Sequence, residues 1–219
     1  MGNQPVWHWA DQGAPTASVT VSSGVGAVTV MDAPSSSQRP YAFVRSSDGH
    51  LWVNWWNGSQ WAWANQGVPA AGVTVNPGVG VATVMDTPSS PQRPYAFVKG
   101  SDGHLWVNWW NGSQWAWANQ GVPAAGTSVS AAVGAITVMD TTLSSQRPYA
   151  FVEGSDGHFW VNWWNGSQWA WANQGVPAAG TPVSAAVGAI TVKDSPSSSQ
   201  RPYAFVRASD ARLWVDWWG

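Results

Sequence analysis

Residues 51–67 read LWVNWWNGSQWAWANQG, and the phrase returns unchanged at 105–121 and with phenylalanine in its first position at 159–175. Its centre is Asn57-Gly58. An Asn-Gly pair between apolar and aromatic segments is the strongest short signal for a β-hairpin, because a tight turn needs positive φ at its central residues. The phrase therefore predicts a tryptophan-rich hairpin that the chain uses repeatedly.

The repeat extends from the hairpin to the whole chain of 219 residues. Its period is 54 residues, and all 20 tryptophans fall on five positions of that period, with four copies each. The second and third copies are nearly identical, which fits either recent duplication or consensus design. Such a period indicates a repeat architecture. We divide the single domain into four units at 7–60, 61–114, 115–168 and 169–219, the last completed by 1–6.

Each unit has the pattern of β-structure. Segments 24–32 and 39–48 mix β-branched and aromatic residues between Gly, Pro and Asp, and the two arms of the hairpin follow them. No segment has an apolar period of 3.6 residues long enough for a helix. Each unit is therefore predicted to be a four-stranded antiparallel sheet, and the protein an all-β β-propeller of four such blades.

The two ends of the sequence are expected to close the ring. Residues 213–219 carry the first arm of the hairpin without its second arm, and residues 6–13, VWHWADQG, carry the second arm without its first. We expect residues 214–218 to pair with 6–10, so that no open sheet edge is left. The alternative is that the same hairpin is completed between two chains, which would give a swapped homodimer with more blades.

Alternation along the hairpin sorts its side chains onto two faces. One face then carries four of the five tryptophans of each unit around a central asparagine. The pairs counted outward from a two-residue Asn57-Gly58 turn are Trp56 with Ser59, Asn54 with Trp61, and Trp52 with Trp63. The tryptophan face carries His50, Trp52, Asn54, Trp56, Trp61, Trp63 and Asn65, and the opposite face carries Leu51, Val53, Trp55, Ala62, Ala64 and Gln66.

The tryptophan face suits a sugar. An indole offers a flat apolar surface to the C–H face of a sugar ring, and an asparagine amide offers a paired donor and acceptor to its hydroxyls. The alternative is that most of these tryptophans fill the gaps between stacked blades. The candidate carbohydrate-binding residues are His50, Trp52, Asn54, Trp56, Trp61, Trp63, His104, Trp106, Asn108, Trp110, Trp115, Trp117, His158, Trp160, Asn162, Trp164, Trp169, Trp171, Trp214, Asp216, Trp218, Trp7 and Trp9.

The phrase WVNWWNGSQWAWANQG, together with the segment SDGHLW before it and the strand RPYAFV, resembles the repeat of bacterial β-propeller lectins of the PLL-like type. The resemblance covers every unit of the chain. It implies carbohydrate binding, often of fucosylated or O-methylated sugars, in shallow pockets formed by the blade hairpins and their neighbours. The best-known members of that family have seven blades, whereas this sequence has four units.

Composition argues against several other classes of protein. Only 9% of residues are charged and the net charge is −2, so no electrostatic footprint for nucleic acid or an anionic membrane is expected. The sequence has no cysteine, no apolar stretch of about 18 residues, and no basic start followed by an apolar run. We expect a soluble protein without a classical export signal or membrane insertion, and the localisation stays open, release from the cell included.

Catalytic and metal sites are not expected either. His50, His104 and His158 recur at the repeat spacing, which places them in different blades and too far apart for one metal ion. The carboxylates Asp32 and Asp48 occur singly in each unit, whereas glycoside hydrolysis needs a specifically placed pair. We therefore expect neither enzyme activity nor a cofactor. The repeated Arg39 is expected to pair with one of these two carboxylates, and the alternative is that it hydrogen-bonds the hydroxyls of a sugar.

Two functions from different classes remain. The first is a multivalent lectin with one shallow sugar site per blade, in which weak sites gain avidity on a glycan-coated surface. The second is a structural or protein-interaction propeller that serves as an assembly module without a ligand. In the fourth unit, Ala211, Arg212 and Asp216 replace the Gly, His and Asn of the other units, so its site is expected to differ from theirs.

Overall fold

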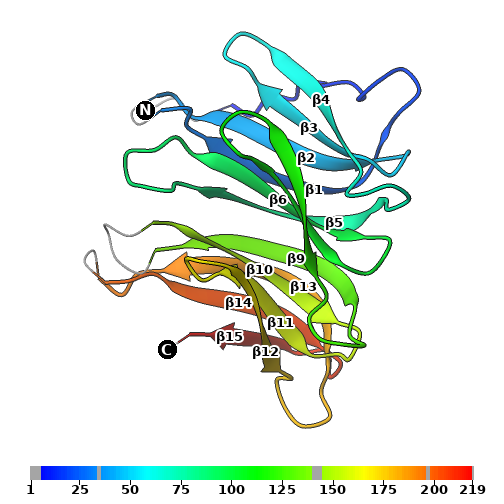
Figure 1. Ribbon diagram of the computed structural model, residues 1–219, viewed down its shortest axis with the longest axis vertical. Coiled ribbons are helices and arrows are strands. Elements are labelled where there is room, and N and C mark those ends of the chain that lie inside the picture. Colours follow the sequence, from blue (N-terminus) through cyan, green and yellow to red (C-terminus); the bar gives the residue numbers. More distant parts are fainter. Residues whose placement is uncertain (1–5, 34–35, 140–144, 196–197, 219) are drawn as a thin grey trace.

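The computed structural model describes residues 6–33, 36–139, 145–195 and 198–218. Among these residues, fifteen strands form four antiparallel sheets, each a meander in chain order, so the all-β class is confirmed. We call the sheets blades 1 to 4 in chain order, and they follow one another along the long axis of the molecule (Figure 1). The described part of the chain has no helix long and apolar enough to cross a bilayer.

The strands of each blade follow the 54-residue period. Blade 1 consists of β1 (Val21–Val30), β2 (Arg39–Ser46), β3 (Leu51–Trp56) and β4 (Trp61–Gly67). Blade 2 consists of β5 (Val75–Val84), β6 (Arg93–Gly100), β7 (Leu105–Trp110) and β8 (Trp115–Gly121). Blade 3 consists of β9 (Val129–Val138), β10 (Arg147–Gly154), β11 (Phe159–Trp164) and β12 (Trp169–Gly175). Blade 4 consists of β13 (Val183–Val192), β14 (Arg201–Ala208) and β15 (Leu213–Trp217).

The hairpin register differs by two residues from the predicted one. Trp56 lies opposite Trp61 instead of Ser59, and blades 2 and 3 repeat this pairing. The cause is the side chain of Asn57, whose Oδ1 accepts hydrogen bonds from the backbone N–H groups of Ser59 and Gln60, both at 3.0 Å. The turn is therefore wider than the predicted two-residue turn. Because the shift is even, every side chain stays on its predicted face.

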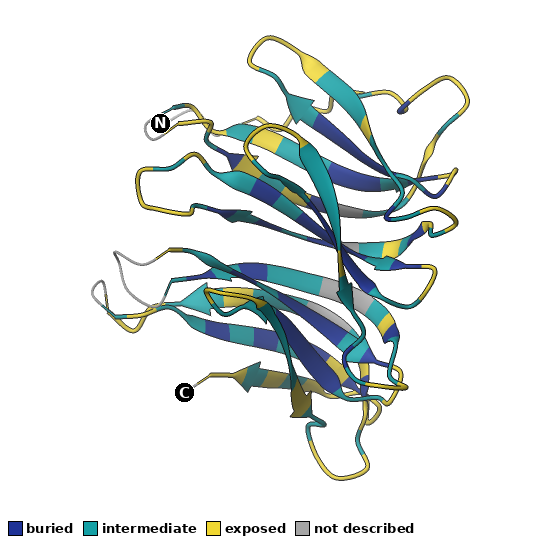
Figure 2. Cartoon of the chain, viewed as in Figure 1, coloured by how far each residue is buried: buried dark blue, intermediate teal, exposed yellow. Residues whose placement is uncertain are grey.

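The hydrophobic core lies in the layers between blades. Phe43 and Leu51 of blade 1 pack against Val98 and Trp106 of blade 2. Equivalent residues form the same layer between blades 2 and 3 and between blades 3 and 4. Figure 2 shows buried residues along the middle strands of the stacked sheets. Each blade thus presents its Leu51-type face to the tryptophan face of the next blade.

The expected pairing of residues 214–218 with 6–10 is absent from the single chain. In the described residues β15 pairs with β14 alone, and residues 6–10 belong to no strand. The physical reason is the course of the stack, which leaves blade 1 and blade 4 at its opposite ends (Figure 1). Each of blades 1 to 3 has four strands, whereas blade 4 has three in the part of the chain described here.

Candidate functional site

A groove opens between blades 1 and 2 at the turn end of their hairpins, and we call it groove 1–2. One wall is made by Tyr41 and Trp55 of blade 1, whose rings stack at 6.3 Å. The other wall is made by Trp110 and Trp115 of blade 2, whose rings meet edge to face at 5.9 Å. The space between them is about 560 Å³, within the usual size of a small-molecule site. Two aromatic walls from consecutive blades therefore face one open cavity.

Charged side chains lie at the rim of this groove. Asp32 of blade 1 and Arg93 of blade 2 both line it. Arg39 contacts Asp32 at 2.7 Å and Arg93 contacts Asp86 at 2.8 Å, which confirms the predicted pairing of the repeated arginine. These pairs are partly exposed and contribute little to stability. Their effect is to hold a donor and an acceptor group in fixed positions at the mouth.

The tyrosines of the groove walls stay uncharged at neutral pH. Burial raises the pKa of Tyr41, and the nearby carboxylate of Asp32 raises it further. Burial and the carboxylate of Asp86 have the same effect on the pKa of Tyr95 in blade 2. The walls are therefore neutral aromatic surfaces with phenol groups that can donate or accept hydrogen bonds.

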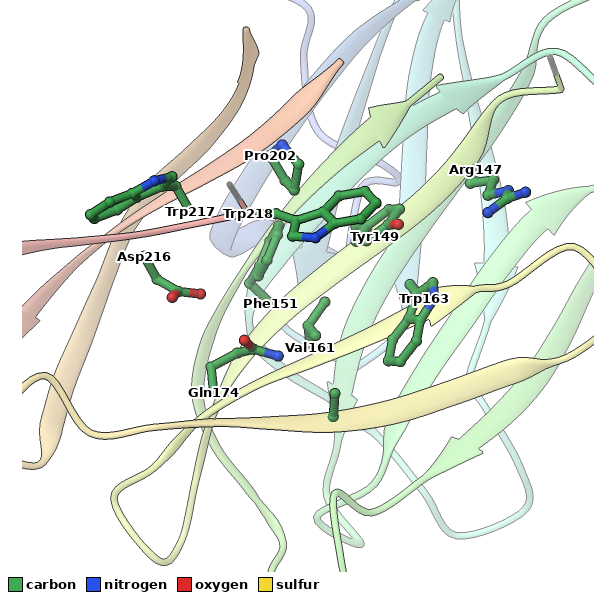
Figure 3. A pocket seen from close by; sticks show the side chains of 11 residues that line it. Arg147, Tyr149, Phe151, Val161, Trp163, Gln174, Pro202, Asp216, Trp217 and Trp218 are labelled. Atoms are coloured by element: carbon green, nitrogen blue, oxygen red, sulfur yellow. The ribbon is translucent and has the colours of Figure 1, made fainter. Parts of the chain in front are cut away.

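The groove recurs along the stack. Groove 2–3, between blades 2 and 3, is lined by Trp109 on one side and Trp169 on the other and has a volume of about 600 Å³. Groove 3–4 is smaller, at about 340 Å³. Blade 4 contributes Trp218 and Asp216 to it (Figure 3), and in the described part of the chain its sheet ends at β15, without a second hairpin arm. Grooves 1–2 and 2–3 therefore have both aromatic walls, whereas groove 3–4 has one full wall and only part of the other.

The asparagines at the centre of the predicted binding face lie inside the blades. Asn54, Asn108 and Asn162 are 4%, 1% and 1% exposed. The side-chain amide of Asn54 donates to the backbone carbonyl of Ala62 at 3.3 Å, and the other two make the equivalent bond. These amides join the two arms of each hairpin from the interior.

The tryptophans of the predicted face divide by their position in the hairpin. Those early in the third strand are buried, namely Trp52, Trp106 and Trp160. Those inside the fourth strand donate the indole N–H to a backbone carbonyl of the preceding outer segment at 2.7–2.8 Å: Trp63 to Gln12, Trp117 to Gln66 and Trp171 to Gln120. Those at the turn end line the grooves, namely Trp110, Trp115, Trp164, Trp169 and Trp218.

The remaining predicted residues lie outside grooves 1–2, 2–3 and 3–4. Trp56 and Trp61 form the edge-to-face pair of blade 1, the first blade of the described chain. Trp7 and Trp9 are exposed, and Trp214 donates to Asp210. The histidines bond to asparagines in the fourth strand, in pairs His50 with Asn65, His104 with Asn119 and His158 with Asn173. The described residues contain no cluster of three or more His, Asp or Glu that could hold a metal ion.

The candidate binding residues predicted from the sequence do not include the wall formed by Trp55, Trp109 and Trp163, because alternation places Trp55 on the opposite face of the hairpin. Each groove combines opposite faces of two consecutive hairpins. The sequence does contain a signal for this wall, because the tyrosine of the RPYAFV strand recurs in every repeat that carries one of these tryptophans. Tyr41 is the cross-strand partner of Trp55, and their equivalents pair in blades 2 and 3.

Blade 1 differs from the others in one buried hydrogen bond. In blades 2 and 3 the indole N–H groups of Trp106 and Trp160 donate to the aspartate four residues earlier at 3.1–3.3 Å. In blade 1 the hydroxyl of Ser46 donates to the corresponding Asp48, and the indole N–H of Trp52 is buried without a partner among the described residues. An unpaired buried donor costs stability.

Replacing Ser46 by alanine is therefore expected to raise the free energy of unfolding by about 1 kcal/mol, because Asp48 can then accept from Trp52. Blade 4 already has this combination, with Ala208 beside a bonded Trp214. Urea denaturation of S46A measures the change. The reverse variant A208S is the control and is expected to be destabilised. A less stable S46A would contradict this account of Trp52.

Among the solved structures that share this arrangement of sheets are fucose-binding β-propeller lectins. The lectin of Aleuria aurantia in complex with α-methyl-L-fucoside matches with a TM-score of 0.61 and 17% identity, over 90% of this chain and 58% of that one. SapL1 lectin in complex with α-methyl fucoside matches with a TM-score of 0.60 and 15% identity, over 90% and 60%. A fucose lectin from Kordia zhangzhouensis in complex with methyl-fucoside matches with a TM-score of 0.50 and 17% identity, over 67% and 97%.

These likenesses show that the four sheets are arranged like the blades of a propeller. The chain spans less than two thirds of the length of the Aleuria and SapL1 lectins, and a further Aleuria structure is described as a six-bladed propeller. No family model matches the chain. No curated protein matches it in sequence.

Proposed function

We propose that this protein is a multivalent carbohydrate-binding protein of the fucose-lectin kind, with one shallow sugar site in each groove between consecutive blades. The observation that carries the proposal is the recurrence of the same two aromatic walls in grooves 1–2 and 2–3. The similar propellers are lectins whose structures contain methyl-fucoside, which supports the choice of ligand. Membership of the PLL-like family and the absence of catalysis belong to this proposal.

The groove offers the two kinds of contact that a sugar needs. Trp55 on one wall and Trp110 on the other present apolar ring surface to the C–H groups of a sugar. Asp32 and Arg93 at the rim present an acceptor and several donors to its hydroxyls. Each site is open and shallow, so single contacts are weak. Repetition of the site on one molecule supplies avidity toward a surface with many glycans.

A structural propeller without a ligand is the second candidate function. The observation in its favour is that the central asparagines and the tryptophans early in the third strand are buried, with Asn108 only 1% exposed. Those repeated positions have a packing role that needs no ligand. The groove tryptophans also contact the core, as Trp115 does with Phe43 at 5.7 Å, but they line open cavities as well, and packing does not account for those cavities.

The double variant W55A/W109A removes one wall from each complete groove and tests the proposal. We expect binding of α-methyl-L-fucoside, followed by calorimetry or by tryptophan fluorescence, to weaken by at least about 30-fold at these grooves. That factor corresponds to the ~2 kcal/mol typical of truncating a tryptophan anchor. Circular dichroism checks that the variant keeps its strands.

The matched control is H50A/H104A, which changes two repeated residues of the predicted face outside the grooves. His50 bonds to Asn65 at 3.1 Å and does not line groove 1–2. Fucoside binding is expected to be unchanged in this control. Loss of binding in H50A/H104A with retention in W55A/W109A would move the site to the tryptophan face of the hairpin. No binding of any sugar on a glycan array would favour the structural propeller.

A further inference from the structure

Strand β15 has a free edge in the part of the chain that the structure describes, and a groove runs along it. This groove has a volume of about 440 Å³ and is lined by Leu213, Trp214 and Val215 together with Gln174 at the end of β12. In blades 1 to 3 the fourth strand lies beside the third strand. Leu213 is 66% exposed, whereas its equivalent Leu51 is fully buried. Among the described residues, blade 4 therefore has three strands and apolar surface along the edge of its last strand.

The segment Val6–Gln12 has the features of the strand that this edge lacks. Its sequence, VWHWADQ, matches QWAWANQ of the fourth strands. Trp7 and Trp9 are 93% and 101% exposed, although the equivalent tryptophans of the other repeats all pack or pair. Two fully exposed indoles on a segment outside any strand make no contact that explains them in the single chain, and the segment matches the free edge in length and pattern.

The far end of this segment is held in place. The backbone carbonyl of Gln12 accepts the indole N–H of Trp63 at 2.8 Å, just as the carbonyl of Gln66 in β4 accepts that of Trp117 at 2.7 Å. The segment is thus fixed to blade 1 in the way that β4 is fixed to blade 2. It stands where the fourth strand of a preceding blade would lie.

Two substitutions at this junction are complementary in charge. In blades 1 to 3 a histidine before the third strand bonds to an asparagine in the fourth, as His50 does with Asn65 at 3.1 Å. The histidine position before β15 holds Arg212, and the asparagine position of the segment holds Asp11. On both sides, the histidine–asparagine pair of the other blades has been replaced by residues of opposite charge. Such a change favours pairing of these two segments with each other.

We propose that Val6–Gln12 of a second copy of this chain pairs with β15, and that two copies thereby close a ring of eight blades. In the register of the complete blades, Trp9 of the second copy lies opposite Asp216, and its Ala10 lies opposite Val215. The indole N–H of Trp9 then reaches the backbone carbonyl of Gln174, as Trp63 reaches that of Gln12. The contact is head-to-tail, and a head-to-tail contact gives a ring when its rotation closes.

The donor is a second copy because the two surfaces of the junction lie at opposite ends of one chain (Figure 1). Gln12 is bonded to blade 1, and β15 is the last strand of blade 4. Most of the chain superposes on part of a six-bladed lectin, in which four consecutive blades do not close a ring. A ring of eight blades lies within the range of four to eight that propellers adopt.

The second copy also completes groove 3–4. Phe43 of blade 1 meets Trp115 of blade 2 edge to face at 5.7 Å, and the same contact recurs between blades 2 and 3. The equivalent partner of Phe151 is Trp7 of the second copy, which also faces Trp218. The incomplete third groove gains its missing wall in this way. A fourth groove forms between blade 4 and the first blade of the second copy.

Disulfide trapping in the double variant A10C/V215C tests this junction, because the chain has no cysteine of its own. Antiparallel strand partners have Cα atoms about 4.5–5.5 Å apart, within the range that a disulfide spans. We expect oxidation to convert the variant into a covalent dimer on a denaturing gel without reductant. The single variants A10C and V215C are the controls and are expected to run as single chains on the same gel, because a head-to-tail contact never brings two copies of one position together.

Sedimentation of the unmodified protein is the second measurement, and we expect twice the chain mass of 23.4 kDa. A disulfide within one chain, seen as a faster monomer band, would overturn the proposal in favour of closure by the chain itself. A ladder of larger covalent species on the gel would show that the chains form an open filament instead of a ring. A sedimentation mass equal to one chain at micromolar protein concentration would contradict the proposal, whatever the A10C/V215C variant shows. No sugar is present, so these results are independent of the proposed lectin function.

Discussion

Replacing Phe97 by alanine is expected to lower the free energy of unfolding by about 3–5 kcal/mol, the usual cost of truncating a buried phenylalanine. Phe97 is fully buried in the layer between blades 2 and 3. Its ring stacks on Tyr95 at 6.4 Å and meets Trp169 edge to face at 5.7 Å. The truncation leaves a cavity between two sheets, and close packing on both sides limits how far that cavity can collapse. Urea denaturation followed by circular dichroism measures the loss.

The matched control is Phe97→Leu at the same position. Leucine keeps much of the apolar volume, so we expect a smaller loss of about 1–2 kcal/mol. A cost below about 1 kcal/mol for F97A would show that the layer between these blades is not a packed core.

Replacing Trp9 by alanine is expected to weaken self-association by at least about 30-fold, since truncation of a tryptophan anchor in an interface typically costs ~2 kcal/mol or more. In the proposed junction Trp9 becomes buried against the edge of β15 and donates to Gln174. In the single chain Trp9 is fully exposed, so the stability of the isolated chain is expected to stay the same. A sedimentation series over protein concentration separates these two effects.

The companion variant Asp216→Asn is expected to act in the opposite direction. Burial raises the pKa of Asp216, and an ionised carboxylate there has no proton to donate. The equivalent Asn54 donates its amide to the carbonyl of Ala62 on the fourth strand. Asparagine at 216 restores that donor toward the strand of the second copy, so association should tighten several-fold, by ~1 kcal/mol. Weaker association in D216N, or unchanged association in W9A, would contradict the proposed register.

The blades themselves could be predicted from the sequence because their determinants are local. Alternation and turn residues define the strands, and the 54-residue period repeats them. The predicted hairpin register differs from the observed one by two residues, and the cause of this difference is also local. Asn57 can occupy a central position of a tight turn, or it can accept backbone N–H groups from just outside the turn, and in this structure it does the second.

The grooves could not be predicted because they depend on how one blade stacks on the next. Periodicity places Trp55 and Trp56 on opposite faces of a hairpin, but it does not say that the face of one blade meets the opposite face of its neighbour. That contact follows from burial of residues such as Phe43 and Leu51 against blade 2. Whether the ring closes within one chain depends on the angle between blades, which is a sum over many side-chain contacts.

The hydrogen bond from the Trp117 indole to the Gln66 carbonyl joins residues 51 positions apart and ties one blade to the next. Each such bond forms only when two neighbouring blades are folded, so the smallest cooperative unit of folding is a pair of blades rather than one blade. Refolding should then advance along the chain by nearest-neighbour steps, as in other repeat proteins. Those steps are unimolecular. The association of two folded chains into the proposed ring is bimolecular, so the last phase of refolding is expected to become faster as protein concentration rises.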